Sequence, residues 1–456
     1  MILVKKYRVL TAVFFAWKCI LFAIAALAPG PGYDTSALIL SNPSLRRHAE
    51  FKNQDFLGRI ALKLFRWDAL YFVTAAQRGQ VYEQEWAFSW AYSGALRMIT
   101  RFFFCTETPP LSAFVWTAVA ISTLMHLSAV MILFRLLNVL TARRNGGRIS
   151  FLACILHIMS PAGLFLVSPY AESAFASLNF LGMLCYAQAG LEQSSNRKQT
   201  FRQDALILCS GMCFALATVA RSNGLLSGLI YLFDFAACVP SVLRSPLSGN
   251  GLRRITVICA AGVLVAVGFV APQYVAYREY CTLGRQITTP WCQRRIPSIY
   301  AWVQSTYWNV GLFRYWTLPN LPLFLLAAPM LCLLLQSSIV HLRYSRPRSS
   351  GADDHDADVK DRDASQDRAL PDHFPQLVFP QLVLAITAAT SFHVQIINRI
   401  SSGYPMWYLS IARWIPSRKV TSENGTSSKK VVIIVRGMIM YAIIQGALFA
   451  NFLPPA

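Results

Sequence analysis

The chain has 456 residues, of which 55% are hydrophobic and only 14% are charged, and its mean hydropathy is +0.42. This composition excludes an ordinary soluble domain and indicates an all-α polytopic integral membrane protein. The formal net charge of +21 fits basic cytoplasmic loops under the positive-inside rule, so it does not predict a nucleic-acid partner.

Hydrophobic segments long enough to cross roughly 30 Å of hydrocarbon recur along the whole chain. They predict about 10–11 transmembrane helices in a single membrane domain over residues 1–456, and the segment at 404–415 is short enough to be re-entrant. The predicted segments are 8–28, 112–140, 149–167, 173–190, 205–220, 224–240, 255–272, 318–341, 376–397, 404–415 and 431–452.

The first segment lacks a small-residue cleavage site, so we expect a retained signal anchor in which Lys18 snorkels toward the interface. Basic residues follow every second segment, as Arg143 and Arg144 follow the second. This alternation predicts a cytoplasmic N-terminus, with the large loops at 29–111 and 273–317 on the opposite, lumenal side.

The first of these loops combines carboxylates with aromatic side chains. Asp68, Glu83 and Glu85 lie in the run RWDALYFVTAAQRGQVYEQEWAF, which also contains Trp67. Carboxylates act as general acids or bases, and aromatic faces pack against sugar rings. We therefore expect catalysis in this loop, with Trp67, Glu83 and Glu85 binding substrate.

Each of these carboxylates also has a purely structural interpretation. Asp68 could cap a helix that begins near Ala69, because Asp is a favoured N-cap residue. Glu83 and Glu85 could be solvated, and they lack the further ligands that a metal site needs. The sequence leaves these alternatives open.

Four later polar segments open to the same side as Asp68 in the predicted topology. Ionisable residues near membrane depth are costly and are functional candidates by default. A shared pocket of carboxylates with Arg and His would suit a lipid-phosphate donor and a hydroxyl acceptor. The substrate-binding candidates are Glu172, Arg221, Asn223, Tyr307, Trp308, Asn309, Arg314, His393 and Arg399.

These residues have structural interpretations as well. Glu172 could be a first-turn acid that favours the helix dipole. Arg221 and Asn223 could join two helices in a tight hairpin. Tyr307 and Trp308 could belong to an interfacial aromatic belt.

Cysteine and glycine patterns predict no cofactor and no metal. Cys281 and Cys292 share one predicted lumenal loop. The sequence is equally compatible with a disulfide between them and with two free thiols. The sequence contains no Cys and His cluster with zinc spacing, no phosphate-cradling glycine loop and no dinucleotide fingerprint. A soluble nucleotide donor is therefore not expected.

The stretch at 344–372 is rich in aspartate and poor in large apolar residues, which predicts a disordered acidic cytoplasmic loop. It lacks the central glycine and terminal glutamate of an EF-hand. The glycosylation sequon that starts at Asn424 also falls on the predicted cytoplasmic side.

Taken together, the motifs resemble the PIG-V family, the second mannosyltransferase of glycosylphosphatidylinositol (GPI) anchor assembly. The chain departs from the family's pattern at two places. Family members often have prolines soon after the Ala-Phe pair of the first loop, where this chain has Ser89, and some have His where this chain has Tyr71. The matching segments are RWDALYF, YEQEWAF, SPYAES, RSNG, PQYVAYREYC, the block from Cys292 to Trp316 and HVQIINRISSGYP.

The resemblance implies a GT-C type glycosyltransferase of the endoplasmic reticulum membrane, with lumenal catalytic loops and Asp68 as the catalytic base. It implies dolichyl-phosphate-mannose as donor and transfer of an α-1,6-linked mannose to a GPI precursor that bears one mannose. A β-linked donor and an α-linked product require a single inverting displacement. Fungal members of the family are thought to work with a small membrane subunit.

Two alternatives remain at this point. One is a GT-C enzyme that uses another sugar or acceptor. The other is a lipid or polyol transporter, for which intramembrane charges are equally natural. A transporter of that kind predicts an internal repeat, and the sequence has none.

The acidic loop provides a first prediction. Replacing residues 351–366 by a Gly/Ser linker should leave the transfer rate nearly unchanged, because this composition does not build a packed core. Transfer is measured at matched protein level, and a large loss would mean that the loop binds something the reaction needs.

Overall fold

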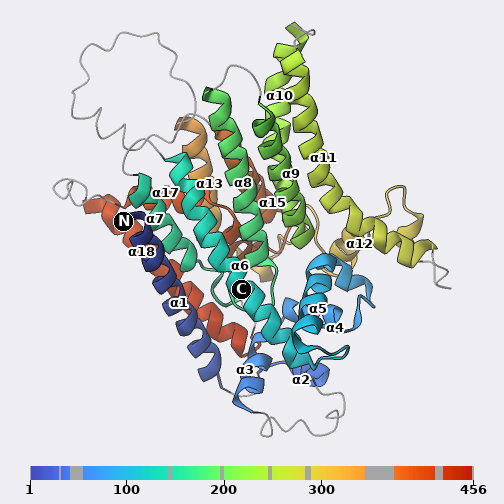
Figure 1. Ribbon diagram of the computed structural model, residues 1–456. Coiled ribbons are helices and arrows are strands. Elements are labelled where there is room, and N and C mark those ends of the chain that lie inside the picture. Colours follow the sequence, from blue (N-terminus) through green and yellow to red (C-terminus); the bar gives the residue numbers. More distant parts are fainter. Residues whose placement is uncertain are drawn as a thin grey trace.

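The computed structural model is helical in every regular element that it describes (Figure 1). Most of the predicted acidic loop at 344–372 lies outside the described residues, and so does Asn424. The described ranges are 2–29, 32–41, 55–141, 146–195, 200–244, 249–282, 289–344, 374–415 and 425–453.

Eight helices in these ranges are long and apolar enough to cross a membrane. A helix satisfies its backbone hydrogen bonds internally, as hydrocarbon surroundings require. The predicted all-α polytopic class is therefore confirmed. The eight are α1 (Ile2–Leu27), α6 (Leu111–Leu140), α8 (Glu172–Ser195), α9 (Phe201–Ala220), α10 (Gly228–Arg244) together with the helical turn that precedes it, α11 (Gly249–Tyr277), α13 (Leu321–Tyr344) and α18 (Gly425–Ala450).

The other three predicted spans contain shorter helices. The segment at 149–167 holds α7 (Gly146–Ile158), which ends before Ser160 and Pro161. Proline disfavours the helical conformation in the residue before it, so the chain turns there. The remaining two segments hold α15 (Phe379–Thr390) and α17 (Met406–Trp414). At 1.5 Å per residue α17 is roughly 14 Å long, far short of a bilayer.

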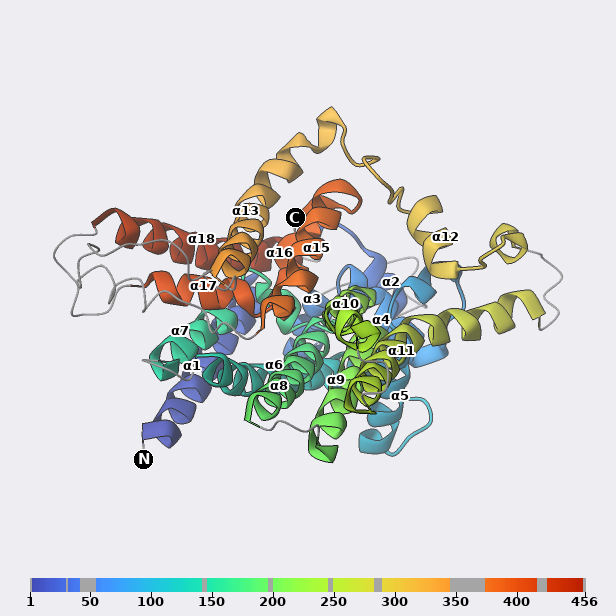
Figure 2. The ribbon, with the colours of Figure 1, turned by 90° about the horizontal axis from the view of Figure 1, so that it is seen from above.

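The long helices form a bundle in which α8 lies between α6 and α9, and α9 packs against α11 (Figures 1 and 2). Glycines permit the close approach of α9 and α11. A Cβ atom on Gly268 would lie 2.5 Å from the carbonyl oxygen of Ala215, and one on Gly211 would lie 2.9 Å from Ala261. Small residues at such crossings are typical of membrane helices.

Lys18 does not snorkel, so this prediction was wrong. Its side chain is 3% exposed, and its ammonium donates a hydrogen bond of 2.8 Å to the carbonyl oxygen of Leu166. Leu166 ends the short turn η4 (Gly163–Leu166), where the chain is not α-helical and carbonyl groups are available as acceptors. A buried partner therefore replaces the interface for this lysine.

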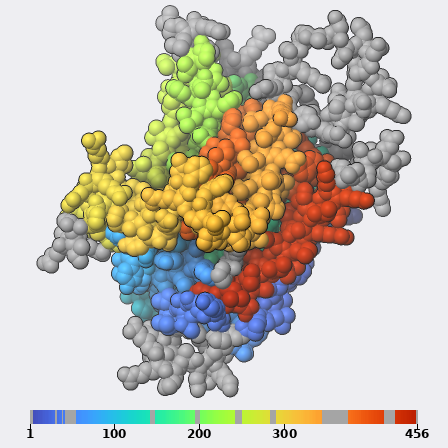
Figure 3. Space-filling model, turned by 180° about the vertical axis from the view of Figure 1, so that it is seen from behind, coloured from blue at the N-terminus to red at the C-terminus, as the bar shows by residue number. Residues whose placement is uncertain are grey.

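The two predicted lumenal loops fold against each other beside the bundle. Trp86 and Trp291 lie in one small apolar core, and a disulfide joins Cys281 to Cys292, whose Cα atoms are 5.7 Å apart. Figure 3 shows the yellow and orange residues from α12 to α13 next to the blue residues of the first loop. The elements here are α2 (Ser36–Ser41), α3 (Phe56–Leu64), α4 (Asp68–Arg78), η3 (Glu83–Ala87), α5 (Trp90–Phe104), η6 (Arg278–Thr282), η7 (Pro290–Gln293), α12 (Ile299–Thr306) and η8 (Leu318–Asn320).

The α9 and α11 crossing provides a prediction with a matched control in the same helix. Gly268→Ala should lower the unfolding free energy by about 1–3 kcal/mol, because the new methyl group would overlap the backbone at Ala215. Gly262→Ala has its nearest neighbour 3.9 Å away and should be neutral or slightly stabilising. Thermal unfolding of the purified protein compares them, and equal effects would contradict this packing.

Candidate active site

Four ionisable side chains from distant parts of the chain meet at the start of α4. Figure 1 shows α4 at one end of the bundle. Asp68 is the first residue of α4 and Glu172 is the first residue of α8. Arg221 directly follows α9, and Arg399 lies in the short helix α16 (Ile397–Ile400). We call these four residues the charge cluster.

Ion pairs join the charge cluster into a chain. Arg399 Nη1 lies 2.8 Å from Asp68 Oδ2, and Arg399 Nε lies 3.0 Å from Glu172 Oε1. Arg221 Nη1 donates to the same Glu172 oxygen at 2.7 Å. Glu172 thus holds two guanidinium groups, and one of them also holds Asp68.

The side chains of the cluster differ in accessibility. Glu172 is 1% exposed, Arg399 12%, Arg221 18% and Asp68 25%. Glu172 Oε2 and Arg221 Nε are buried and have no hydrogen-bond partner among the described residues. The cluster therefore combines a buried anchor with a reachable carboxylate, and it retains one acceptor and one donor for a ligand.

Aromatic rings enclose Arg399. Its guanidinium carbon lies 4.9 Å from the centre of the Phe165 ring and 5.3 Å from that of Tyr170. Burial tends to lower the pKa of Arg399, but the negative charges of Asp68 and Glu172 outweigh it and raise this pKa above its usual value. Arg399 is thus a permanent positive charge in largely buried surroundings.

Asp68 is presented by an unusual backbone turn. Trp67 has φ 54° and ψ −125°, a conformation that a residue with a side chain rarely adopts. The Tyr170 hydroxyl accepts a hydrogen bond of 3.1 Å from the Asp68 backbone N–H and donates one of 3.2 Å to the Arg66 carbonyl oxygen. Trp67, not Asp68, takes the cap position before α4, and the Asp68 carboxylate contacts Arg399 instead.

Asn223 lies in the turn η5 (Ser222–Ser227), which joins α9 to α10 as the hairpin interpretation expected. Its side-chain amide donates to the Tyr404 hydroxyl at 3.0 Å, and that hydroxyl donates to the Asn223 carbonyl oxygen at 3.3 Å. Tyr404 follows the turn η11 (Ser401–Gly403) and is fully buried. These bonds fix the segment that follows Arg399 against the one that follows Arg221.

Glu83 is not a solvated loop residue. Its carboxylate accepts hydrogen bonds from the indole N–H groups of Trp291 and Trp302, both at 2.9 Å, and from the hydroxyl of Tyr307 at 3.1 Å. Three donors from the second loop thus hold it. Glu83 therefore joins the two loops, and these hydrogen bonds occupy its carboxylate without any bound substrate.

Glu85 is also occupied, and its side chain is 3% exposed. It pairs with Arg78 at 2.5 Å and accepts from the backbone N–H groups of Val81 and Tyr82 at 2.6 and 3.1 Å. The solvated interpretation is therefore wrong for both glutamates, because Glu83 joins the two loops and Glu85 organises the turn around it.

The candidates near the second loop lie on a strap, residues 307–316, that crosses the end of α15. The N–H of Gly311 donates to Ser391 O at 3.1 Å, and the N–H of Phe313 donates to Thr390 O at 2.6 Å. A helix end has free carbonyl groups, and the strap satisfies them. His393 Nε2 lies 2.8 Å from the Trp308 carbonyl oxygen.

The predicted binding roles on this strap differ in their structural support. His393 stacks on Tyr315 with ring centres 4.8 Å apart, so the ring is already engaged by the strap. Asn309 and Arg314 are exposed, and Asn309 adopts a positive φ of 51° at the bend. No ion pair joins Arg314 to the charge cluster among the described residues.

Trp67 packs against Phe452 near the C-terminus, with ring centres 5.2 Å apart. Sequence reasoning missed two residues here, Tyr170 and Arg66. Tyr170 lies within SPYAES and Arg66 directly precedes Trp67, so both were inside quoted motifs. Arg66 is fully buried, and burial lowers its pKa to about 10, although the charge of Asp34 acts in the opposite direction.

Among the described residues, no group of three or more His, Cys, Asp or Glu side chains lies close enough together to hold a metal ion. The charge cluster has only two carboxylates, and both of them face arginines. Its chemistry suits proton transfer and the binding of an anion.

Comparison with known proteins assigns the family. Residues 3–456 match the family described as mannosyltransferase (PIG-V). The chain belongs to the PIG-V mannosyltransferase family. It is 39% identical to GPI mannosyltransferase 2 of Aspergillus oryzae, covering 98% of this chain and 96% of that protein. It is 40% identical to GPI mannosyltransferase 2 of Gibberella zeae, covering 98% and 97%.

Among solved structures, the chain is similar to the oligosaccharyltransferase of Archaeoglobus fulgidus, with a TM-score of 0.43 and 11% identity. The match covers 96% of this chain and 55% of that one. As a PIG-V family member the protein is a membrane glycosyltransferase, and the transporter alternative is set aside.

Tyr170→Phe tests how Asp68 is positioned. The change removes the hydroxyl that bridges Asp68 and Arg66. If Asp68 is the predicted base, kcat should fall about tenfold with little change in KM, since a misplaced catalytic group slows the chemical step. Tyr231→Phe is the control, because it also loses a buried hydroxyl contact, with Ser210 on α9, away from the cluster. Equal losses in both variants would assign Tyr170 a purely structural role.

Proposed function

We propose that the protein transfers the second mannose, in α-1,6 linkage, from dolichyl-phosphate-mannose to a GPI precursor that bears one mannose. The reaction takes place on the lumenal side of the endoplasmic reticulum membrane. The family, the names of the relatives and the sequence resemblance support the substrates. The observation that carries the proposal is the charge cluster, in which Arg399 pairs with the accessible carboxylate of Asp68, and the buried Glu172 pairs with both Arg399 and Arg221.

The distribution of basic residues supports a lumenal location for the cluster. Lys6, near the start of α1, donates to the carbonyl oxygen of Gly147 at the start of α7, and Arg343 lies in the last turn of α13. These basic helix ends belong to the predicted cytoplasmic face. Glu172 and Arg221 lie at the other ends of their helices from the basic loop between α8 and α9.

Asp68 acts as the general base. It takes the proton of the acceptor's primary hydroxyl as that oxygen bonds to C1 of mannose and the bond from C1 to the phosphate oxygen breaks. The donor sugar is β-linked and the product is α-linked, so one inverting displacement suffices. The bond electrons stay with dolichyl phosphate, which leaves with one more negative charge.

Arg399 and Arg221 stabilise that leaving phosphate, because a planar guanidinium group binds phosphate oxygens in pairs. When Asp68 becomes protonated, its ion pair with Arg399 weakens, and Arg399 turns to the new negative charge. Glu172 is a positioning residue that orients both arginines. This geometry favours Arg399 and Arg221 over Arg314 and His393 as phosphate ligands.

Depletion of the protein in cells tests the reaction itself. We expect accumulation of a GPI precursor with a single mannose, identified by mass spectrometry. The alternative, a GT-C enzyme for another sugar or acceptor, predicts normal GPI intermediates, and that result would overturn the proposal.

Asp68→Asn tests the base. The change keeps the size of the side chain but removes the basic electron pair, so transfer should fall by roughly 10²–10⁴-fold with expression unchanged. The assay uses the purified donor and a one-mannose acceptor. Glu83→Gln and Glu85→Gln serve as comparisons and should lose less, because both carboxylates support the loop. Full activity in Asp68→Asn, or a deeper loss in Glu85→Gln, would place the base elsewhere.

A further inference from the structure

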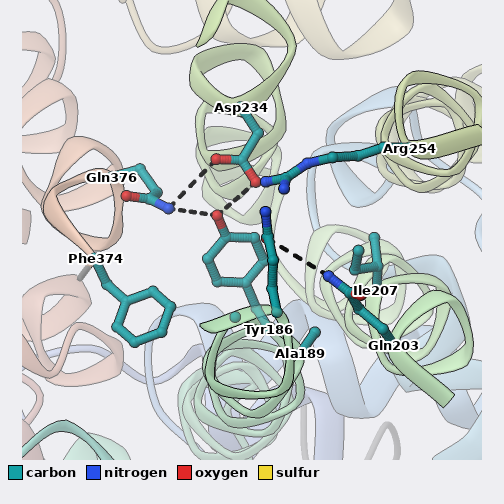
Figure 4. Close-up of a pocket in the computed structure, with 10 residues that line it drawn as sticks. Tyr186, Ala189, Gln203, Ile207, Asp234, Arg254, Phe374 and Gln376 are labelled. Atoms are coloured by element: carbon teal, nitrogen blue, oxygen red, sulfur yellow. Dashed lines mark hydrogen bonds between the residues drawn. The ribbon is translucent and has the colours of Figure 1, made fainter. Parts of the chain in front are cut away.

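A cavity of about 280 Å³ opens between α8, α9, α10, α11 and the segment that leads into α15 (Figure 4). Polar side chains line most of it, with Phe374 and Ile207 as apolar walls. The polar lining includes Tyr186, Gln193, Gln203, Asp234, Arg254 and Gln376.

This cavity is separate from the charge cluster. Tyr186 follows Glu172 by 14 positions along α8, which corresponds to roughly 21 Å at 1.5 Å per residue. Gln203 lies in the first turn of α9, and Arg221 directly follows the last turn of that helix. The cavity is therefore nearer the opposite end of the bundle, and the proposed reaction does not use it.

A buried polar network forms one wall. Asp234 Oδ2 accepts a hydrogen bond of 2.6 Å from the Tyr186 hydroxyl. The side-chain amide of Gln376 donates to that hydroxyl at 2.5 Å and to Asp234 Oδ1 at 3.3 Å. All three side chains are more than nine-tenths buried, and Gln376 Oε1 has no hydrogen-bond partner among the described residues.

A cationic side chain complements this wall. Figure 4 shows the Arg254 guanidinium group reaching from α11 toward the Asp234 carboxylate. Two opposite charges and an unused acceptor thus line one partly enclosed space. Ionisable residues in such surroundings are costly, pair with one another and are candidates for ligand binding. A ligand with only a negative charge would be repelled by Asp234, and a ligand with only a positive charge would be repelled by Arg254.

We propose that this cavity binds a zwitterion that joins a phosphate ester to a primary ammonium group. The phosphate lies on Arg254, because a guanidinium group binds phosphate oxygens in pairs. The ammonium lies on Asp234 and on the Gln376 carbonyl oxygen, which supply acceptors for its N–H groups. Phosphatidylethanolamine in the membrane and free O-phosphoethanolamine share this chemistry.

Native mass spectrometry of the full-length protein in detergent tests the site, with phosphatidylethanolamine and phosphatidic acid as probes. Asp234→Asn should weaken phosphatidylethanolamine binding about tenfold, the usual effect of losing one charged hydrogen bond, and should not weaken phosphatidic acid binding. Arg254→Gln should weaken both. Arg253→Gln is the matched control, because Arg253 pairs with Asp204 and does not line the cavity.

Competition distinguishes the two sources of the ligand. Displacement of the lipid by O-phosphoethanolamine would indicate a free small molecule, and a failure to displace it would indicate a membrane lipid. If Asp234→Asn does not fold, the comparison of Arg254→Gln with Arg253→Gln still decides the matter. If Arg254→Gln binds each of the two lipids as tightly as Arg253→Gln does, the proposal is overturned.

Discussion

The buried carboxylate of Glu172 is the interaction on which the rest of the site depends. An anion that is 1% exposed is tolerated only with close partners, and Glu172 has two of them, Arg221 and Arg399. Arg221 directly follows α9 and Arg399 lies within α16, so one carboxylate fixes the relative positions of α8, α9 and α16. Because Arg399 also holds Asp68, the first loop is positioned by the same contact.

The irregular backbone near this anchor follows from the same requirement. Arg399 lies between the turns η10 (Val394–Ile396) and η11 (Ser401–Gly403), and Glu172 follows the turn η4. Broken helices are tolerated in a membrane protein where they line a polar site, since other groups there satisfy the free backbone. The strap and the Tyr404 hydroxyl supply such groups. The short helices thus bring charged side chains together where continuous spans would keep them apart.

Much of this architecture is predictable from the sequence, and particular residues show where prediction stops. The eight long helices follow from hydrophobic length, because a span needs a run of apolar residues. Lys18 was mispredicted, because its acceptor at Leu166 becomes available only where the chain turns after α7. Asp68, Glu172, Arg221 and Arg399 were all named, yet their pairing is a tertiary contact that no local pattern encodes.

The role of a residue is likewise hard to predict from the sequence when it depends on tertiary contacts. Glu83 and Glu85 have the composition of a sugar-binding loop, but three donors from another loop hold Glu83, and Arg78 holds Glu85. Tyr170 has no chemistry of its own that would mark it as important. It matters because its hydroxyl lies between two backbone groups of another segment, Asp68 and Arg66.

The central claim is that Asp68 and Arg399 work as one catalytic unit, and a double-mutant cycle on the transfer rate tests it most directly. Asp68→Asn, Arg399→Gln and the double variant are compared with the unmodified protein in the purified assay. If the two residues act together, the double variant loses little more than the more damaging single change. Losses that multiply would show that the two side chains act independently and would contradict this account.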